Sequence, residues 1–426
     1  MNSTAFWRDI RFLQILAQVI FVLLLALMAG LLYANVSANL DRQGLTVGYG
    51  FMTNPASFDI GESHIPYRAS NSYGRALLVG LVNTLVISAL GIVLTTVVGI
   101  IAGVARLSSN WLISRIAAAY VGVIRNTPLL IQLMFWYFGI FLQLPAVKQA
   151  IALPGRMYFT RRGVYLPWYE AMSTFDSWRV YIWLALASIV MIWIIFRAIQ
   201  NRSTLPPPLW WYLAYLFVPV LIVWIGFTLQ PEPPLRASIP ELTGLNFRGG
   251  LRWTPEFAAL LFGLVVYTGA FVAEIVRAGI QAVSRGQVEA ARSLGLNTGQ
   301  TLRLIVFPQA LRVIIPPLTS QYLNLAKNSS LAIAIGYPDL FSIAGTVINQ
   351  TGAVIEVIVI MMLSYLSMSL FTSLLMNIYN SRVRLVERIR ISAPVFVGIQ
   401  RPPTSGTTYS GIVSQRICQA HLAYVY

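Results

Sequence analysis

Long runs of apolar residues separated by polar segments are the dominant pattern of this chain. A helix needs roughly 20 mostly apolar residues to cross the hydrocarbon core of a bilayer. By this measure the sequence predicts an all-α polytopic membrane protein with about eight transmembrane helices. The predicted helices lie near residues 13–35, 76–104, 129–144, 180–196, 209–229, 257–276, 311–335 and 354–379.

The first of these runs also has features of a secretory signal. Arg8 and Arg11 precede it, and small residues that resemble a cleavage site follow it at 36–38. A signal core usually holds about 7 to 15 apolar residues. Because the run at 13–35 is longer, we interpret it as a retained membrane helix.

Composition agrees with the membrane assignment. The chain of 426 residues is 57% hydrophobic and only 10% charged, whereas soluble domains carry about a quarter charged residues. The net charge of +16 would suit a nucleic-acid-binding protein,. The basic residues are scattered through short loops, however, without a basic run interleaved with aromatic residues. We therefore expect no nucleic-acid partner.

The distribution of charge predicts the orientation in the membrane. Arginines concentrate in the segments 106–125, 197–202, 277–312 and 382–390, where acidic residues are few. By the positive-inside rule these segments are cytoplasmic. Both ends of the chain are then expected on the cytoplasmic side.

Residue types exclude two kinds of chemistry. One cysteine, Cys418, and two histidines, His64 and His421, offer no zinc or Cys/His catalytic cluster, so we expect neither a metal site nor an enzyme active site,. Neither of the two lysines, Lys148 and Lys327, follows a glycine. The GxxxxGK[ST] phosphate loop therefore cannot occur in this sequence. If ATP drives the protein, a separate subunit must bind it.

The most informative segment is the polar stretch 287–296, between the sixth and seventh apolar runs. It predicts a helix, a turn and a second helix. Ala290, Ala291 and Leu294 are expected on one side of the first helix. Gly295 is expected to take the left-handed conformation that ends it. An ordinary loop lying on the membrane surface is the alternative that the residue types alone leave open.

The second helix is expected to begin at a Thr298 cap and to continue to residue 307. Pro308 is expected to break the chain before the next span. The spacing of the whole segment resembles the EAA motif of ABC-importer permeases, although Phe307 stands where that family usually has leucine. The matching positions are Glu289, Ala290, Ala291, Gly295, Ile305 and Pro308.

Three further stretches resemble the polar amino-acid branch of the type I permeases, which serves histidine, glutamine and general L-amino acids. They are Arg-Asn-Thr-Pro-Leu-Leu-Ile-Gln at 125–132, Ala-Glu-Ile-Val-Arg-Ala-Gly-Ile at 273–280 and Lys-Asn-Ser-Ser-Leu-Ala at 327–332. In this family the EAA loop is a coupling helix that docks on an ATPase, and the core has five spans. Here these would be the second, third, sixth, seventh and eighth.

The resemblance implies a division of the chain. Residues 1–75 would form an extra N-terminal transmembrane helix and a periplasmic loop, and residues 76–390 the permease core, with a two-helix segment inserted at about 145–256. Such additions resemble the larger permeases of general L-amino-acid and glutamate/glutamine/aspartate importers. The tail at 391–426 shows neither helical periodicity nor the family pattern. A disordered extension, a regulatory tail and a translated frame change each account for it.

The resemblance also implies a function. The chain would be the membrane-spanning permease subunit of an ATP-driven amino-acid ABC importer in the bacterial inner membrane, coupled to ATPase subunits through the loop 283–308. Expected partners are two ATP-binding cassette subunits that hold ATP and Mg²⁺, a second homologous permease, a periplasmic amino-acid-binding protein, the amino-acid substrate and membrane lipid. No cofactor is expected in this chain. The alternatives are an ion-coupled secondary amino-acid transporter and a membrane-embedded enzyme.

Ionisable groups within spans are candidates for function by default because burying them in a membrane is costly. Lys327, with Asn324 and Ser320 on the same side of its helix, can meet a substrate carboxylate, or these groups can form interhelical hydrogen bonds. Glu274 and Arg277 predict an internal ion pair, with a gate role as the alternative. Glu356 is expected to be an ordinary boundary residue. The candidate pathway or gate residues are Asn83, Glu274, Asn324, Lys327 and Asn328.

Overall fold

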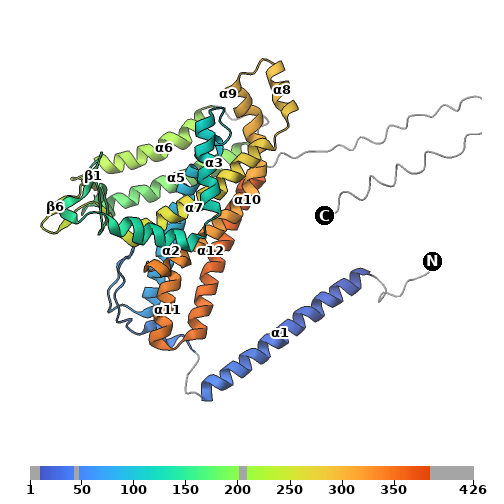
Figure 1. Ribbon diagram of the computed structural model, residues 1–426. Coiled ribbons are helices and arrows are strands. Elements are labelled where there is room, and N and C mark those ends of the chain that lie inside the picture. The colour runs from blue at the N-terminus through green and yellow to red at the C-terminus, as the bar shows by residue number, and fades with distance from the viewer. Residues whose placement is uncertain (1–9, 43–47, 201–208, 384–426) are drawn as a thin grey trace, which may run out of the picture. The chain divides into compact units, whose positions relative to one another are not determined.

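The protein is described by a computed structural model over residues 10–42, 48–200 and 209–383 (Figure 1). The tail expected at 391–426 lies outside the described residues. The α-helices are α1 (Ile10–Arg42), α2 (Tyr73–Ala105), α3 (Trp111–Arg125), α4 (Leu129–Met134), α5 (Phe175–Gln200), α6 (Leu209–Thr228), α7 (Pro255–Gln281), α8 (Arg285–Ser293), α9 (Thr298–Thr301), α10 (Phe307–Asn328), α11 (Leu340–Thr351) and α12 (Val354–Val383). The strands are β1 (Ile151–Leu153), β2 (Met157–Thr160), β3 (Gly163–Leu166), β4 (Trp168–Ala171), β5 (Leu235–Ser238), β6 (Glu241–Thr243), β7 (Asn246–Arg248) and β8 (Leu251–Trp253). Short 3₁₀ or π-helical segments are η2 (Tyr49–Thr53), η3 (Phe135–Ile140), η4 (Phe141–Gln143), η5 (Val147–Gln149), η6 (Leu302–Val306) and η7 (Ser329–Ile335).

Six of the described helical segments are long and apolar enough to cross a membrane. A seventh candidate is the bent pair of α3 with Leu129–Gln143, and α6 contributes a shorter apolar helix at Leu213–Thr228. The expectation of a helical membrane protein is therefore confirmed, with six or seven candidate spans in the described residues where the sequence predicted about eight. The six are Leu13–Asn35, Tyr73–Ala105, Phe175–Gln200, Pro255–Gln281, Thr298–Ile335 and Val354–Asn380.

The third predicted span, 129–144, is not a straight membrane helix. The helical segment Leu129–Gln143 follows α3, and the two helices are bent by 106° relative to each other. Pro128 is the N-cap of α4, and the chain turns there because the residue before a proline avoids the helical conformation,. Gln132 closes the turn by donating to the carbonyl oxygens of Ile124 and Thr127, at 2.9 Å each. Part of the Arg-Asn-Thr-Pro stretch therefore shapes a corner between two helices.

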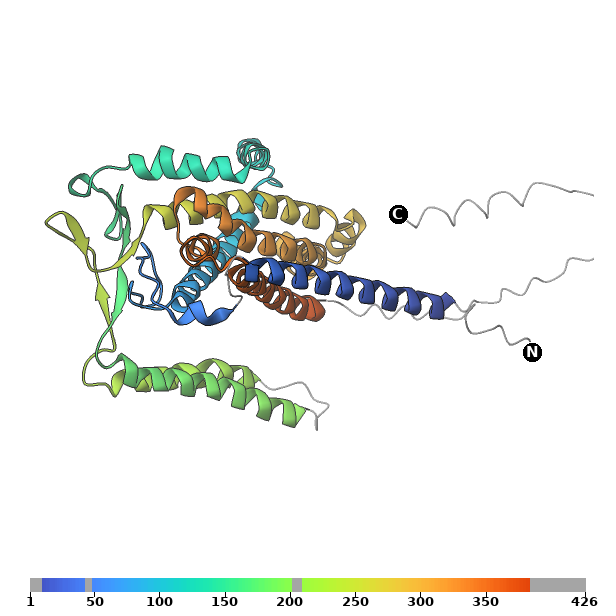
Figure 2. The ribbon, with the colours of Figure 1, turned by 90° about the horizontal axis from the view of Figure 1, so that it is seen from below.

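α7 is the central helix of the bundle and packs against α2, α3 and α10. Figure 2 shows α7, α10 and α12 side by side, with α2 crossing them obliquely. The backbones of α2 and α7 approach closely at Gly99 and Gly103. A Cβ atom at Gly99 would lie 2.3 Å from Cγ1 of Val272, and one at Gly103 would lie 2.7 Å from the carbonyl oxygen of Ala273. Small residues at this spacing let membrane helices pack backbone to backbone.

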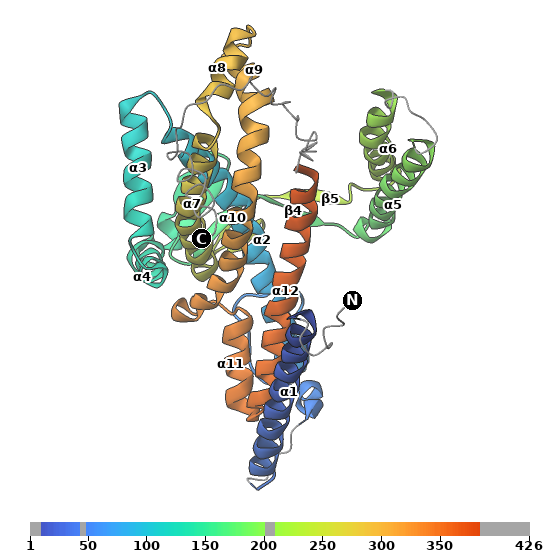
Figure 3. The ribbon, with the colours of Figure 1, turned by 90° about the vertical axis from the view of Figure 1, so that its right-hand side faces the viewer.

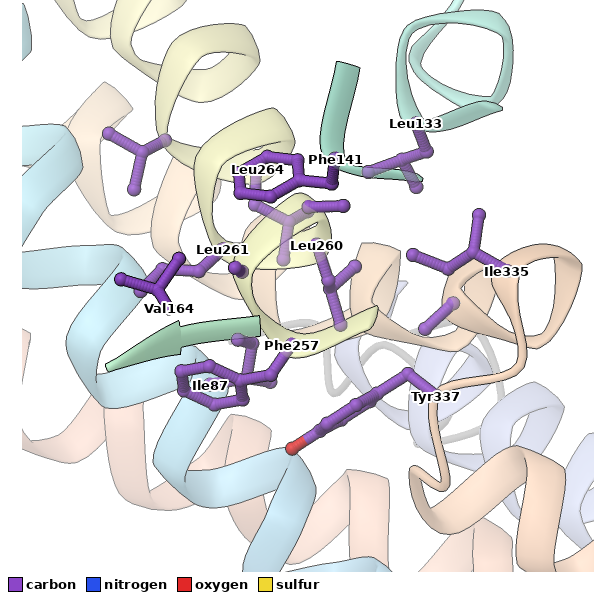
Figure 4. Packing of buried hydrophobic residues seen from close by; sticks show 14 of the residues in the cluster. Ile87, Leu133, Phe141, Val164, Phe257, Leu260, Leu261, Leu264, Ile335 and Tyr337 are labelled. Carbon is purple, nitrogen blue, oxygen red and sulfur yellow. The ribbon is translucent and has the colours of Figure 1, made fainter. Parts of the chain in front are cut away.

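The largest hydrophobic cluster surrounds the first turns of α7. Figure 4 shows Phe257, Leu260 and Leu264 of α7 among side chains from several other segments, with Ile87 of α2 and Tyr337 beside them. All five are nearly inaccessible to solvent. This end of α7 is therefore a packed junction of distant parts of the sequence.

Short strands form a feature that the sequence analysis did not predict. β1, β2, β3 and β8 make an antiparallel sheet, in which Tyr165 of β3 stands opposite Arg252 of β8. The β4–β5 ribbon leads to α5 and α6, which lie side by side as a helical hairpin in Figure 3. The all-α expectation is wrong for this segment, because strands of three or four residues are too short to show a period of two.

Two helices were also missed. α3 and α11 have 15 and 12 residues, so neither appears as an apolar run of membrane length,. Local caps define α11: the Asp339 carboxylate accepts the N–H of Ser342 at 2.8 Å, and Gly352 ends the helix with φ +70°.

The close approach of α2 and α7 predicts that Gly103→Leu is destabilising. A larger side chain there must displace backbone of α7, at a cost of about 1–3 kcal/mol. The thermal unfolding midpoint of the purified protein in detergent should fall. Gly122→Leu is the control, because a Cβ atom at Gly122 meets nothing within 4 Å. Equal midpoints for both variants would contradict the close packing.

Candidate coupling loop and membrane pathway

The predicted helix–turn–helix between the sixth and seventh spans is present as α8, a turn and α9. α8 ends in a Schellman motif around Gly295, which has φ +80°,. The N–H of Leu296 donates to the carbonyl of Ala291 at 3.2 Å, and the N–H of Gly295 donates to that of Arg292 at 2.9 Å. The left-handed conformation expected at Gly295 is confirmed.

The second helix is capped one residue earlier than predicted. The side chain of Asn297 accepts the N–H of Gln300 at 2.9 Å, and the Gln300 side chain accepts the N–H of Asn297 at 3.0 Å. This reciprocal pair is a capping box,. Thr298 is therefore the first residue of α9 and not its cap. The Asn297–Gln300 pair satisfies two backbone N–H groups that would otherwise be unpaired, whereas a Thr298 cap would satisfy only one.

Pro308 does not break the chain, contrary to expectation. It lies in the first turn of α10, directly after the π-helical segment η6, and the helical path continues from Thr298 to Ile335. A proline is tolerated where the helix needs no N–H donor, and the wider π turn supplies such a place. The loop is thus connected to a membrane span by continuous helix.

The two ends of the loop are held by close packing of α7 and α10. A Cβ atom at Gly279 would lie 2.3 Å from Cγ1 of Ile314, and Ala310 is fully buried between the helices. Ile305 and Pro308 are partly buried near this contact.

The loop itself has one buried face and an exposed tip. Ala291 is buried, whereas Glu289 and Ala290 are exposed. Leu294 is 82% exposed. The expectation that Leu294 shares a side with Ala291 is wrong, because the helix ends there and the turn points the leucine away from the bundle.

Glu274 is the centre of an ion-pair cluster toward the α8 end of α7. The expected pair with Arg277 is confirmed: Nε of Arg277 donates to Oε1 of Glu274 at 3.1 Å. Arg106, just after α2, also donates to the carboxylate, and Arg125 at the end of α3 lies 3.7 Å from Oε2. The guanidinium of Arg125 stacks 5.1 Å from the ring centre of Phe271. Sequence reasoning missed Arg106 and Arg125, because they lie more than 140 residues from Glu274 in the chain.

Asn83 lies at the opposite end of the bundle, where it ties segments together. Its fully buried amide donates to the carbonyl oxygens of Glu62 and Pro338, at 2.9 Å each. The hydroxyl of Tyr337 donates to the carbonyl of Asn83 at 3.4 Å. Asn83 therefore joins separate segments of the chain through hydrogen bonds. Glu356 was expected to be an ordinary boundary residue, but it is buried and accepts the N–H of Gly48 at 2.7 Å.

The carboxyl of Glu62 completes this junction. It accepts a hydrogen bond from the hydroxyl of Thr254, the N-cap of α7, and lies 3.9 Å from Nε2 of His64. Burial raises the pKa of Glu62 from its ordinary 4.5 to about 7, against the opposing effect of the Thr254 hydrogen bond,. Burial also lowers the pKa of His64, so the pair is not held by a strong charge attraction. Burial likewise raises the pKa of Asp339 to about 6.

A polar face of α10 is left uncovered by the residues that the structure describes. Ser320, Asn324 and Lys327 are exposed along one side of the helix, and Asn328 beside them is partly buried. The opposite side, with Leu318, Tyr322 and Leu325, is buried. The five candidate residues thus fall in three places: Asn83 in one junction, Glu274 in the ion cluster, and the other three on α10.

Together these features define an integral membrane protein with a loop of two capped helices at one end of its bundle and a polar helix face that no described residue covers. A family profile described as "Binding-protein-dependent transport system inner membrane component" matches residues 203–385. YhdX of Escherichia coli strain K12, whose name places it among amino-acid ABC transporter permeases, is 45% identical over 376 residues, covering 88% of this chain and 94% of YhdX.

Two further relatives match over most of their length. The general L-amino acid transport system permease protein AapQ of Rhizobium johnstonii is 41% identical, over 89% of this chain and 94% of its own. The glutamate/glutamine/aspartate/asparagine transport system permease protein BztB of Rhodobacter capsulatus is 40% identical, over 89% and 96%. The chain belongs to this family of binding-protein-dependent inner-membrane permeases. It is accordingly a multi-pass inner-membrane protein that is not an enzyme, and the ATPase that binds ATP is a separate subunit.

The raised pKa of Glu62 predicts a pH-dependent stability. Between its unfolded pKa near 4.5 and its folded pKa of about 7, only the folded state keeps the proton, so stability falls as pH rises through this interval. At pH 8 the ionised, buried carboxylate should cost up to about 3 kcal/mol relative to pH 5. Glu62→Gln should remove that loss and raise the thermal unfolding midpoint at pH 8, with little change at pH 5. The exposed Glu170→Gln serves as control, and an equal pH dependence for Glu62→Gln and wild type would refute the assignment.

Proposed function

We propose that this chain is the permease subunit of an ATP-driven ABC importer for amino acids. Its family membership and the names of YhdX, AapQ and BztB support the substrate class. The α8–α9 loop is the element that receives motion from the ATPase subunits. The observation that carries this assignment is the loop's construction: a Schellman motif and a capping box back to back, between two closely packed helices.

This construction suits a lever. A loop whose backbone donors are satisfied within itself resists bending, and its displacement is passed to α7 and α10. The exposed Leu294 offers an apolar tip for a groove on the partner, with Glu289 and Ala290 exposed nearby. We place the docking contact at the exposed Glu289, Ala290 and Gly295. The buried Ala291 and the partly buried Ile305 and Pro308 would support it from the bundle.

The uncovered face of α10 supports a paired assembly. A stripe of serine, asparagine and lysine on a membrane helix is costly against lipid, so it faces either another protein or an aqueous path. A second homologous permease packed near α10 would place Asn324, Lys327 and Asn328 at a central pathway, and the ammonium of Lys327 would meet the carboxylate common to amino acids. The Glu274 cluster would act as a gate beside this path.

The proposed topology has both chain ends in the cytoplasm, together with α8 and α9. The core would occupy residues 76–390, preceded by an added helix in 1–75. The segment at about 145–256 would be an insertion whose strands lie on the periplasmic side and whose α5–α6 hairpin enters the membrane. There a periplasmic amino-acid-binding protein would deliver substrate, and closure of the ATPases on ATP would turn the pair outward to receive it.

Gly295 provides the test of coupling. Gly295→Val forces a β-branched residue into a left-handed conformation, at a cost of about 1–3 kcal/mol, whereas Gly295→Asn tolerates it. We expect Gly295→Val to lower ATP-driven amino-acid uptake in proteoliposomes about tenfold, and Gly295→Asn to keep most of it. Both variants should retain the wild-type unfolding midpoint within a few degrees. Wild-type uptake by Gly295→Val would exclude the loop as the coupling element.

Lys327 tests the pathway. Lys327→Met should reduce the maximal uptake rate about tenfold at saturating binding protein, while Lys327→Arg keeps the charge and most of the rate. Co-purification of the ATPase should be unaffected in both. If Lys327 only forms hydrogen bonds between helices, Lys327→Met will instead lower the unfolding midpoint and leave the rate per folded complex unchanged.

A further inference from the structure

The strands between α4 and α7 build a surface to which the proposed transport cycle assigns no contact. We call it the insert surface: the β1–β2–β3–β8 sheet together with the β6–β7 hairpin. A groove of about 370 Å³ opens between them. Its lining includes Lys148, Arg156, Tyr158, Leu242 and Phe247, with Glu241 as its one acidic residue. Aromatic residues and arginine are enriched at protein-recognition surfaces.

The insert surface and the adjoining β4–β5 ribbon are strongly basic. Segments 145–174 and 230–254 hold three acidic residues, Glu170, Glu232 and Glu241, and more than twice as many basic ones. All the basic side chains are exposed, and none forms an ion pair with an acidic residue of the described chain. They are Lys148, Arg156, Arg161, Arg162, Arg236, Arg248 and Arg252.

The groove is ordered before any partner arrives. The rings of Tyr158 and Phe247 stack at 4.5 Å, which joins β2 to the hairpin. Arg162 donates to the carbonyl of Leu245 at 3.1 Å and holds the hairpin tip. Leu245 is nonetheless 67% exposed and Leu242 50% exposed. A preformed site of this kind loses little entropy on binding.

The chain itself places the insert surface far from the coupling loop. β8 ends just before the N-terminus of α7, and α8 begins shortly after the C-terminus of α7. The 27 residues of α7 between them span about 40 Å. If α8 is the cytoplasmic end, the insert surface lies outside the membrane on the other side. Clusters of arginine are unusual there, because the positive-inside rule disfavours them.

We propose that the insert surface is a docking site for an acidic face of the extracytoplasmic binding protein, with Lys148 and Arg156 at the groove as its main charged contacts. This inference rests on the proposed function, which supplies a binding protein on that side. Excess positive charge would steer an acidic partner to the site and speed its arrival. The exposed leucines and the Tyr158–Phe247 stack would supply the apolar contact.

The test is a titration of the reconstituted transporter in nanodiscs with the liganded binding protein that supports uptake by the wild type. The combined variant Lys148→Glu and Arg156→Glu should raise the half-saturating concentration for ATPase stimulation about tenfold in 50 mM salt, and much less in 500 mM salt, because salt screens the contact. The maximal stimulated rate should stay the same.

Arg179→Glu is the matched control for the single variant Arg156→Glu. Arg179 is also exposed and stands at the start of α5, where it pairs with Asp176 rather than facing the groove. Unchanged half-saturation in Arg156→Glu, or an equal change in Arg179→Glu, would overturn the docking site. So would a loss that appears in anionic-lipid nanodiscs and vanishes in neutral ones, since that marks a lipid contact.

A photo-crosslinker at Leu242 gives an independent measurement. Irradiation with the purified binding protein should yield a covalent product, and excess unlabelled binding protein should suppress it; its absence would count against the site. Failure of the proposed function is distinguishable, because wild-type complex would then show no ATP-driven uptake and no stimulation by the binding protein at all.

Discussion

The close packing of α7 against α2 on one side and α10 on the other is the contact on which the rest of the structure depends. Glycines at 99, 103 and 279 let the backbones approach to distances that a single added methyl group would prevent. In a bilayer, where lipid tails are as apolar as leucine, such van der Waals contact replaces the hydrophobic effect between helices. This packing of α7 against α2 and α10 sets the positions of both ends of α7.

At one end, α7 carries the Glu274 cluster and leads into α8. One carboxylate holds arginines from the ends of α2, α3 and α7 itself, so three helices meet where the loop begins. At the other end, Thr254 caps α7 and binds Glu62, while Asn83 links the same region to Pro338. A displacement of the loop therefore acts on a helix that is tied at both ends, which favours movement of the bundle over bending of one helix.

The local features of the site were readable because they depend on neighbours in sequence. Gly295 in a left-handed turn, the helix on either side of it and the Glu274–Arg277 pair all follow from residues within one or two turns of helix. Two local predictions, the cap of α9 and the break at Pro308, were wrong because neighbouring residues offered another local structure. Asn297 with Gln300 outcompeted Thr298 as a cap, and the π segment before Pro308 absorbed a proline that would otherwise interrupt the helix.

Sequence alone determined that this chain is a helical membrane protein with a helix–turn–helix loop and no ATP-binding motif, because apolar run length and residue spacing are local properties of the chain. Only the tertiary structure decided which groups meet. Arg106 and Arg125 join Glu274, Asn83 joins Pro338, and short strands nearly ninety residues apart pair as β3 and β8. Those contacts depend on how the helices and strands pack. The residues next to a side chain in the sequence do not show which distant residue folding will bring to it.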